Sequence, residues 1–121
     1  MRALIVDDSR PIRHIEGEML KELGFETCDA CHGKEALERL QTGQLPDIIL
    51  VDWNMPEMDG LEFIKTVRQD ARYSGTMLLM VTTETETDQM LRALTAGADE
   101  YLMKPFTKDG LISKLQLIGV V

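Results

Sequence analysis

The sequence lacks any long hydrophobic run. No apolar stretch in its 121 residues approaches the roughly 20 residues that a membrane-spanning helix needs, which excludes membrane insertion. The N-terminus also lacks a secretory signal, because Arg2 is followed by only a short apolar run before Asp7 and Asp8. We therefore expect a cytoplasmic protein.

Positive charge is in short supply as well. Lys and Arg number 13 against 21 Asp and Glu, which gives a formal net charge of −8. This acidic balance disfavours non-specific binding to nucleic acid and suits proteins or cations as partners. The sequence has no internal repeat, low-complexity segment or linker, and its length suits one domain. Because the last periodic segment ends just before Val121, we expect residues 1–121 to form a single domain without an output domain.

Cysteine is scarce, but the two cysteines present stand close together. Cys28 and Cys31 form with His32 the pattern Cys-x-x-Cys-His, the attachment motif of c-type haem, although haem attachment requires export. A redox-active dithiol is a second interpretation. In a third, Cys28 is a small hydrophobe on a short strand and Cys31 lies in the following loop. Zinc is disfavoured here because it takes about four ligands and only three candidates cluster.

What the sequence does contain is a regular alternation of apolar runs with segments of helical periodicity. Apolar runs predict strands at residues 2–6, 47–51, 77–81 and 101–103, and residues 25–30 read as a further short strand. Continuous apolar strands alternating with amphipathic helices are typical of a parallel sheet covered on both faces. Right-handed crossovers then favour a doubly wound sheet. We predict an α/β fold in which a βα unit occurs five times, (βα)5, around a parallel five-stranded sheet.

The helices between these strands are predicted from caps and apolar periodicity. Ser9, Asp59 and Thr107 are plausible N-caps, and Gly24, Gly43 and Gly97 end three of the helices. The residues expected to face inward, in chain order, are Ile12, Ile15, Met19, Leu23, Ala36, Leu37, Leu40, Leu61, Ile64, Val67, Leu111, Leu115 and Ile118. Leu91 and Leu94 are expected to lie inward or half-inward.

Polar side chains follow four of the five predicted strands. Asp7 and Asp8 follow the first strand, Asp52 the third, Thr82 the fourth and Lys104 the fifth. In open parallel sheets, ligands bind beyond the carboxyl ends of the strands, so these side chains are expected to converge at one edge. Two carboxylates about 5 Å apart repel by roughly 3 kcal/mol at an effective dielectric of 20, so three of them need a cation or a lysine. Oxygen ligands alone favour Mg²⁺, with Mn²⁺ and Ca²⁺ as alternatives.

Asp52 is the candidate nucleophile of this edge. A carboxylate can accept a phosphoryl group, and the transfer needs mainly in-line positioning and positive charge around the phosphoryl oxygens. Lys104 can supply such a charge, and the Thr82 hydroxyl can donate a hydrogen bond to another oxygen. Taken singly, each of these residues could equally be an ordinary turn or cap residue, and only their joint placement at strand ends points to a site.

The residues at this edge resemble the receiver domain of two-component response regulators, above all its stand-alone chemotaxis members. The resemblance covers essentially the whole chain and implies the flavodoxin-like strand order 2-1-3-4-5. It rests on Val6-Asp7-Asp8, Val51-Asp52-Trp53-Asn54-Met55-Pro56, Asp59-Gly60, Val81-Thr82, Gly97-Ala98, Tyr101 and Lys104-Pro105-Phe106.

The resemblance implies a role for each site residue. Asp52 would be the phosphoacceptor, served by a histidine kinase. Asp8 would bind Mg²⁺ directly and Asp7 partly through water, with Asp52 and the backbone carbonyl of Asn54 as further ligands. In addition, Thr82 and Lys104 would contact the phosphoryl group, and the bond before Pro105 would be cis.

The same resemblance implies a signalling switch and not a classical enzyme. Its only reactions would be self-phosphorylation and autodephosphorylation. Thr82 would move toward the phosphoryl group and Tyr101 would favour a buried rotamer. Asn54 and Glu84 would tune the phosphoryl lifetime. A downstream protein would bind the face made by the fourth helix, fifth strand and fifth helix. The chain itself is expected to be monomeric. The candidate residues of that face are Thr87, Met90, Leu94, Tyr101 and Lys114.

Three alternatives stay open at this point. The chain could be a single-domain phosphorelay shuttle rather than a chemotaxis effector, since both share this pattern. An aspartyl-phosphate phosphatase would carry a second aspartate two residues after the nucleophile, where Asn54 stands. A flavodoxin-like cofactor binder is disfavoured because Asp7 and Asp8 would repel a flavin phosphate. The helix start Ser9-Arg10-Pro11 departs from the chemotaxis pattern, so the partners stay undetermined.

Overall fold

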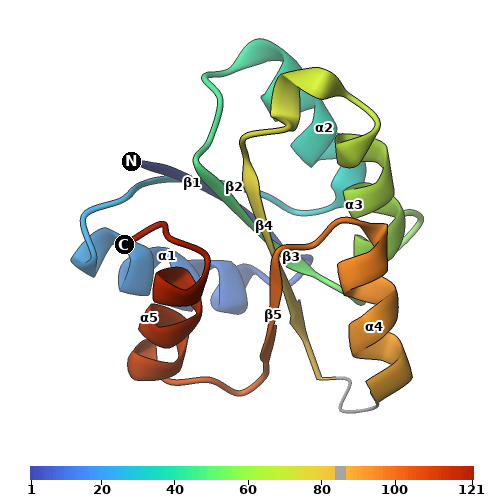
Figure 1. Ribbon diagram of the computed structural model, residues 1–121. Coiled ribbons are helices and arrows are strands. Elements are labelled where there is room, and N and C mark those ends of the chain that lie inside the picture. Colours follow the sequence, from blue (N-terminus) through green and yellow to red (C-terminus); the bar gives the residue numbers. More distant parts are fainter. Residues whose placement is uncertain (84–86) are drawn as a thin grey trace.

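Strands and helices alternate along the whole chain in the computed structural model, which describes residues 1–83 and 87–121 (Figure 1). The elements are β1 (Arg2–Val6), α1 (Arg10–Glu22), β2 (Glu26–Ala30), α2 (Gly33–Thr42), β3 (Ile48–Asp52), α3 (Gly60–Arg68), the 3₁₀ turn η1 (Ala71–Tyr73), β4 (Met77–Thr82), α4 (Thr87–Ala96), β5 (Glu100–Met103) and α5 (Lys108–Leu117). Among these described residues, no helix has the length and apolar character of a membrane span.

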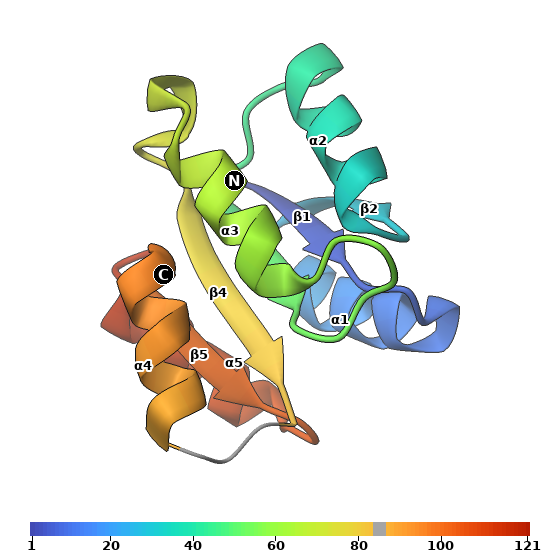
Figure 2. The ribbon, with the colours of Figure 1, turned by 90° about the vertical axis from the view of Figure 1, so that its right-hand side faces the viewer.

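The five strands form one parallel sheet in the order β2-β1-β3-β4-β5, which confirms the predicted fold and strand order. The register pairs Val6 with Val51 and Asp52 with Val81, so the carboxyl ends of the three central strands lie level. Helices α1 and α5 cover one face of the sheet, and α2, α3 and α4 cover the other (Figures 1 and 2).

Each face of the sheet carries its own hydrophobic core, which is why the central strands β1, β3 and β4 read as continuous apolar runs. Along β1, Leu4 packs toward α2 and α3, whereas Ile5 packs toward α1 and α5. The central strand β3 is the most deeply buried, with no residue from Ile48 to Val51 more than 1% exposed. The site at the strand ends therefore stands on a rigid base.

The predicted caps are present at three helices. The Ser9 hydroxyl accepts a hydrogen bond from the Ile12 N–H at 3.4 Å, and the Thr107 hydroxyl accepts one from the Gly110 N–H at 3.0 Å. Asp59 caps α3 in the same way. These caps satisfy N–H groups that a helix cannot pair internally.

The predicted inward face of α1 is wrong in one position. Ile15 is 49% exposed, and the buried side of the helix consists of Glu16, Gly17 and Leu20 instead. Gly17 has no side chain, and a Cβ placed there would lie 3.6 Å from the Ile5 side chain of β1. The helix therefore approaches the sheet along Gly17, which turns Ile15 outward.

The predicted inward leucines of α4 are also largely wrong. Leu91 is 55% exposed and Leu94 is 39% exposed, whereas Ala93 is buried against the α3 side of the core. A small side chain at the contact lets the helix lie close to its neighbours, and the larger side chains then point to solvent.

The interpretation of Cys28 as a small hydrophobe on a short strand, with Cys31 in the following loop, is half right. Cys28 lies on β2 and Cys31 in the loop, but Cys28 is exposed.

Candidate functional site

The charged residues at the strand ends meet, as predicted. Lys104 follows β5, and its Nζ lies 2.9 Å from Asp7 Oδ2 and 3.2 Å from Asp52 Oδ1. Both carboxylates are buried, and the Lys104 side chain is only 19% exposed. One ammonium thus joins the ends of β1, β3 and β5 into a single site.

Asp7 is held rigidly by the start of α1. Its Oδ1 accepts a hydrogen bond from the Ser9 N–H at 2.8 Å, and its carbonyl oxygen accepts one from Arg13 Nη1 at 2.8 Å. Its own N–H donates to the Ala30 carbonyl at the end of β2. Sequence reasoning did not assign Arg13 to the site, because a side chain that binds a backbone carbonyl leaves no mark in a motif.

Three carboxylates of this site could hold a divalent cation. Asp7, Asp8 and Asp52 each offer one oxygen, and these oxygens lie within 4.8 Å of one another. Asp8 is exposed to solvent, so an ion could enter and keep several waters. Mg²⁺ suits this donor set, because it prefers oxygen and rarely uses a closed cage of protein ligands. The residues present therefore fit the predicted cation.

The electrostatics of the site reflect its crowding. Burial and the neighbouring charge of Asp7 raise the pKa of Asp52, although the Lys104 ammonium opposes them. Burial lowers the pKa of Lys104, but its hydrogen bond to Asp7 and the charge of Asp52 outweigh this effect and raise that pKa. The lysine is therefore charged at neutral pH and partly neutralises the two aspartates.

A buried glutamate beside this site was missed from the sequence. Glu16 of α1 is 2% exposed, and its Oε2 has no hydrogen-bond partner within residues 1–83 and 87–121. Burial, followed by the charges of Asp7 and Asp52, raises the pKa of Glu16 to about 8, against the opposing charge of Lys104. A signal for it existed, because Glu16 stands four residues after Ile12 and four before Leu20, on the side that the helix buries.

The connection from β3 to α3 is shaped by a close backbone approach. The Gly60 N–H donates to the Trp53 carbonyl at 2.9 Å, and a Cβ at Gly60 would overlap the Asp52 carbonyl oxygen. Only glycine fits this position, so the loop carrying Asn54 folds back directly over the end of β3. Asn54 is exposed at the tip of this connection.

Thr82 ends β4 and completes the row of strand ends. It is buried, pairs with Met103 in the sheet register, and accepts a hydrogen bond from the Lys104 N–H through its carbonyl at 2.8 Å. The Lys104–Pro105 peptide bond is cis. Thr82 and Lys104 are therefore tied to each other through the backbone.

The residues predicted for the partner face are only partly described. Tyr101 and Lys114 lie together, with Lys114 Nζ 4.5 Å from the centre of the Tyr101 ring and 3.4 Å from Glu100 Oε1. Met90 is half-buried and Leu94 is exposed on α4. Glu84 lies outside the described residues, as does the side chain of Thr87.

Comparison with known proteins identifies the family to which this fold belongs. Residues 3–116 match the family described as response regulator receiver domain. Chemotaxis protein CheY1 of Helicobacter pylori (strain ATCC 700392 / 26695) is 41% identical over 119 residues, which cover 98% of this chain and 96% of that protein. The chemotaxis protein CheY homolog of Campylobacter jejuni (subsp. jejuni serotype O:23/36, strain 81-176) is 41% identical over 117 residues, or 96% and 90% of the two chains.

Solved structures lead to the same result. The chemotaxis response regulator CheY4 of Vibrio cholerae superposes with a TM-score of 0.90 at 39% identity, covering 97% of each chain. The chain therefore belongs to the response regulator receiver domain family. Within that family it is a CheY-like receiver domain of a two-component system, a class of signalling proteins that typically binds Mg²⁺ and is not a class of classical enzymes.

Proposed function

We propose that this protein is a phosphorylation-dependent switch in which Asp52 accepts a phosphoryl group from a histidine kinase. The observation that carries the proposal is the Lys104 ammonium between Asp7 and Asp52, in a cluster of three carboxylates that fits a divalent cation. In the transfer, the bond between the kinase imidazole nitrogen and phosphorus breaks as an Asp52 oxygen bonds to phosphorus.

The residues of the chain have separate parts in this step. Asp52 presents its carboxylate from the end of a rigid strand, which supports the in-line geometry that phosphoryl transfer needs. Mg²⁺, when bound through Asp7, Asp8, Asp52 and the Asn54 carbonyl, would neutralise charge on the phosphoryl oxygens. Lys104 can move its hydrogen bond from the Asp52 carboxylate to a phosphoryl oxygen, and the Thr82 hydroxyl can donate to another.

The output of the switch is proposed to pass through the face of α4, β5 and α5. Movement of Thr82 toward the phosphoryl group would favour a more buried Tyr101, which is half-buried here and packs partly against the core. A change at Tyr101 would alter its contact with Lys114, and Met90 and Leu94 of α4 offer apolar surface to a protein partner. Thr87, at the start of α4, belongs to the same proposed face.

The CheY relatives favour a chemotaxis-type pathway over a phosphorelay shuttle, because both relatives are named as chemotaxis proteins. Asn54 and Glu84 are proposed to tune the lifetime of the phosphoryl group. We propose that the chain works as a monomer in the cytoplasm, where a histidine kinase would meet it. Its partners are proposed to be proteins and not nucleic acid, and its net charge of −8 supports this choice of partner.

Incubation with a small phosphodonor and Mg²⁺ tests the proposal. Wild-type protein is expected to gain one phosphoryl group per chain, and Asp52→Asn is expected to gain none under the same conditions. Asp59→Asn, which changes a half-buried capping aspartate at the start of the next helix, serves as the control and should label like the wild type. Stoichiometric labelling of Asp52→Asn would contradict the assignment of the phosphoacceptor.

A further inference from the structure

The Cys-x-x-Cys-His segment takes no part in the proposed phosphoryl transfer, yet it carries a second group of metal-ligating atoms. Cys31, His32 and Glu35 each place one ligand atom within 4.8 Å of the other two. Cys31 and His32 follow the end of β2, and Glu35 lies in the first turn of α2. All three residues are only partly buried, which leaves a path for an ion to enter.

The sulfur and one carboxylate oxygen already stand at the spacing that a bound ion requires. Cys31 Sγ donates a hydrogen bond to Glu35 Oε2 across 3.4 Å. A tetrahedral Zn²⁺ with bonds of about 2.3 Å to sulfur and about 2.1 Å to oxygen holds these two ligands about 3.6 Å apart. Replacing the thiol proton by an ion therefore needs little change in the distance between these two atoms.

The Glu35 carboxylate is oriented toward the sulfur by contacts on its other oxygen. The Cys31 N–H donates to Oε1 at 3.3 Å, and Arg39 Nη2 lies 3.5 Å from the same atom. Outer partners of this kind fix the orientation of ligating carboxylates in metal sites. They leave Oε2 directed at the sulfur.

His32 contributes an unshared electron pair next to these atoms. Its Nδ1 accepts a hydrogen bond from the Glu35 N–H at 3.1 Å and so caps the start of α2. Coordination through this nitrogen replaces the capping bond, which is a single hydrogen bond at the start of α2.

We propose that Cys31, His32 and Glu35 form a second metal site, for Zn²⁺ or a similar transition-metal ion, separate from the carboxylate site at Asp52. The sequence disfavoured zinc on Cys28, Cys31 and His32, whereas the structure brings Glu35 to Cys31 and His32 in place of Cys28 and leaves the fourth position to water. One thiolate, one imidazole and one carboxylate suit such an ion rather than Mg²⁺. On binding, the sulfur–metal bond forms as the Cys31 thiol gives its proton to the solvent.

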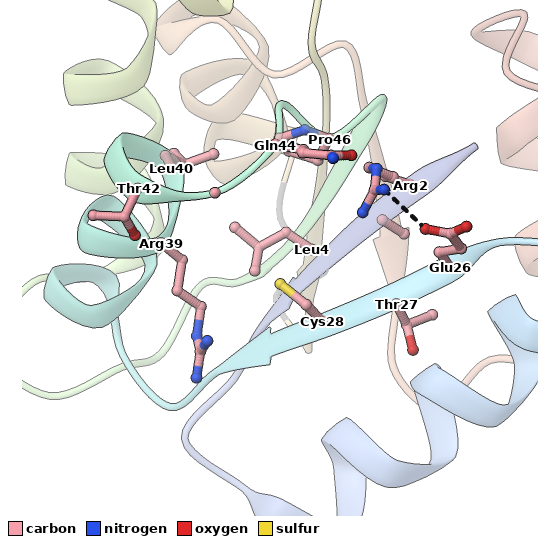
Figure 3. A pocket seen from close by; sticks show the side chains of 12 residues that line it. Arg2, Leu4, Glu26, Thr27, Cys28, Arg39, Leu40, Thr42, Gln44 and Pro46 are labelled. Carbon is pink, nitrogen blue, oxygen red and sulfur yellow. Dashed lines mark ion pairs between the residues drawn. The ribbon is translucent and has the colours of Figure 1, made fainter.

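The other cysteine does not belong to this site. Cys28 points from β2 toward α2, into a pocket of about 290 Å³ that Arg2, Leu4 and Arg39 also line (Figure 3). It is absent from the group of clustered ligand atoms among the described residues. Cys28 therefore provides a matched control, a thiol three residues away on the same chain.

Titration of the full chain with Co²⁺, which reports thiolate ligation through a charge-transfer absorption band, tests the site. Excess Mg²⁺ occupies the carboxylate site, and a reductant that does not bind metals keeps the thiols reduced. Wild-type protein is expected to show the band saturating at one Co²⁺ per chain, with release of about one proton and displacement by Zn²⁺. Cys28→Ser and Asp52→Asn are expected to keep the band.

Variants of the three ligands separate coordination from folding. Cys31→Ser is expected to abolish the band, and Glu35→Gln to weaken Co²⁺ binding at least tenfold. His32→Asn keeps a capping side chain, so α2 should stay intact by circular dichroism while binding weakens at least tenfold. The proposal is overturned if wild-type protein shows no band at millimolar Co²⁺, if the band survives Cys31→Ser, or if it disappears in Cys28→Ser.

Discussion

Two residues at the edge of the sheet, Lys104 and Glu16, respond in opposite ways to the same two aspartates. Lys104 lies between Asp7 and Asp52 and gains from their charge, whereas Glu16 is buried near them and is penalised by it. The lysine could be expected from a chain motif. The glutamate was missed, although its spacing from Ile12 and Leu20 placed it on the side of α1 that is buried.

Replacing Glu16 by glutamine is expected to stabilise the protein at neutral pH. The folded chain holds a proton on Glu16 up to about pH 8, whereas the unfolded chain releases it near pH 4.5. The contribution of Glu16 to the free energy of unfolding is thus fully present below about pH 4.5 and is lost as the pH rises toward 8. At pH 7 the loss is on the order of 3 kcal/mol. Glutamine does not titrate, so Glu16→Gln avoids this loss.

Urea unfolding at several pH values, without divalent cations, measures the effect. The stability difference between Glu16→Gln and wild type should be near zero at pH 4 and grow steadily to pH 8. Glu18→Gln, an exposed change on the same helix, is the control and should show little dependence. A Glu16→Gln difference that stays constant with pH would show that Glu16 is ionised in the folded protein.

Removing the charge of Lys104 is expected to tighten the binding of Mg²⁺. The ammonium competes with the cation for oxygens of Asp7 and Asp52. A positive charge about 5 Å away also weakens the binding free energy of a cation by several kcal/mol before solvent screening. We expect Lys104→Met to bind Mg²⁺ at least tenfold more tightly. Trp53, buried beside Asp52, allows the titration to be followed by fluorescence.

A control for this titration comes from the same end of the chain. Lys108→Met removes an ammonium that pairs with Glu22 on the exposed surface, and it should leave the affinity for Mg²⁺ nearly unchanged. Equal or weaker Mg²⁺ binding by Lys104→Met would mean that Lys104 organises the carboxylates more than it opposes the cation.

At the scale of single elements, the connection from β3 to α3 decides how Asp52 is presented. Gly60→Ala would place a Cβ 2.9 Å from the Trp53 Cα and overlapping the Asp52 carbonyl oxygen, both of them backbone atoms that cannot turn aside. We expect a loss of about 1–3 kcal/mol in the free energy of unfolding, together with weaker Mg²⁺ binding.

Gly75→Ala is the matched control for Gly60→Ala, because a Cβ there meets no atom within 4 Å. Its stability should stay within about 0.5 kcal/mol of the wild type in the same urea titration. If the two alanine variants lost equal stability, the close approach at Gly60 would not be what constrains the connection.

The elements also show where sequence reasoning succeeded and where it failed. The central strands were predictable because they are buried on both faces, so Ile48 to Val51 of β3 reads as an unbroken apolar run. Helix faces were less predictable, since periodicity identifies an apolar stripe but not its rotation against the sheet. In α1 the contact at Gly17 set that rotation, and in α4 the small Ala93 did.

At the scale of the whole molecule, the parallel order of the sheet is what turns scattered residues into a site. Asp7 and Lys104 are 97 positions apart in the chain, yet they form an ion pair because right-handed crossovers return every strand in the same direction. The convergence of Asp7, Asp52 and Lys104 was therefore predictable from strand ends alone. The cluster at Cys31 was not, because it depends on side-chain directions in one loop.

The central claim is that Asp52 itself receives the phosphoryl group with the help of a divalent cation. Borohydride reduces an acyl phosphate to an alcohol, so mass spectrometry of peptides from phosphodonor-treated, reduced protein identifies the modified side chain directly. We predict that residue 52 is converted to homoserine when Mg²⁺ is present and stays aspartate when the cation is removed. Conversion at Asp7, Asp8 or any other carboxylate, or equal conversion at Asp52 without Mg²⁺, would contradict the account.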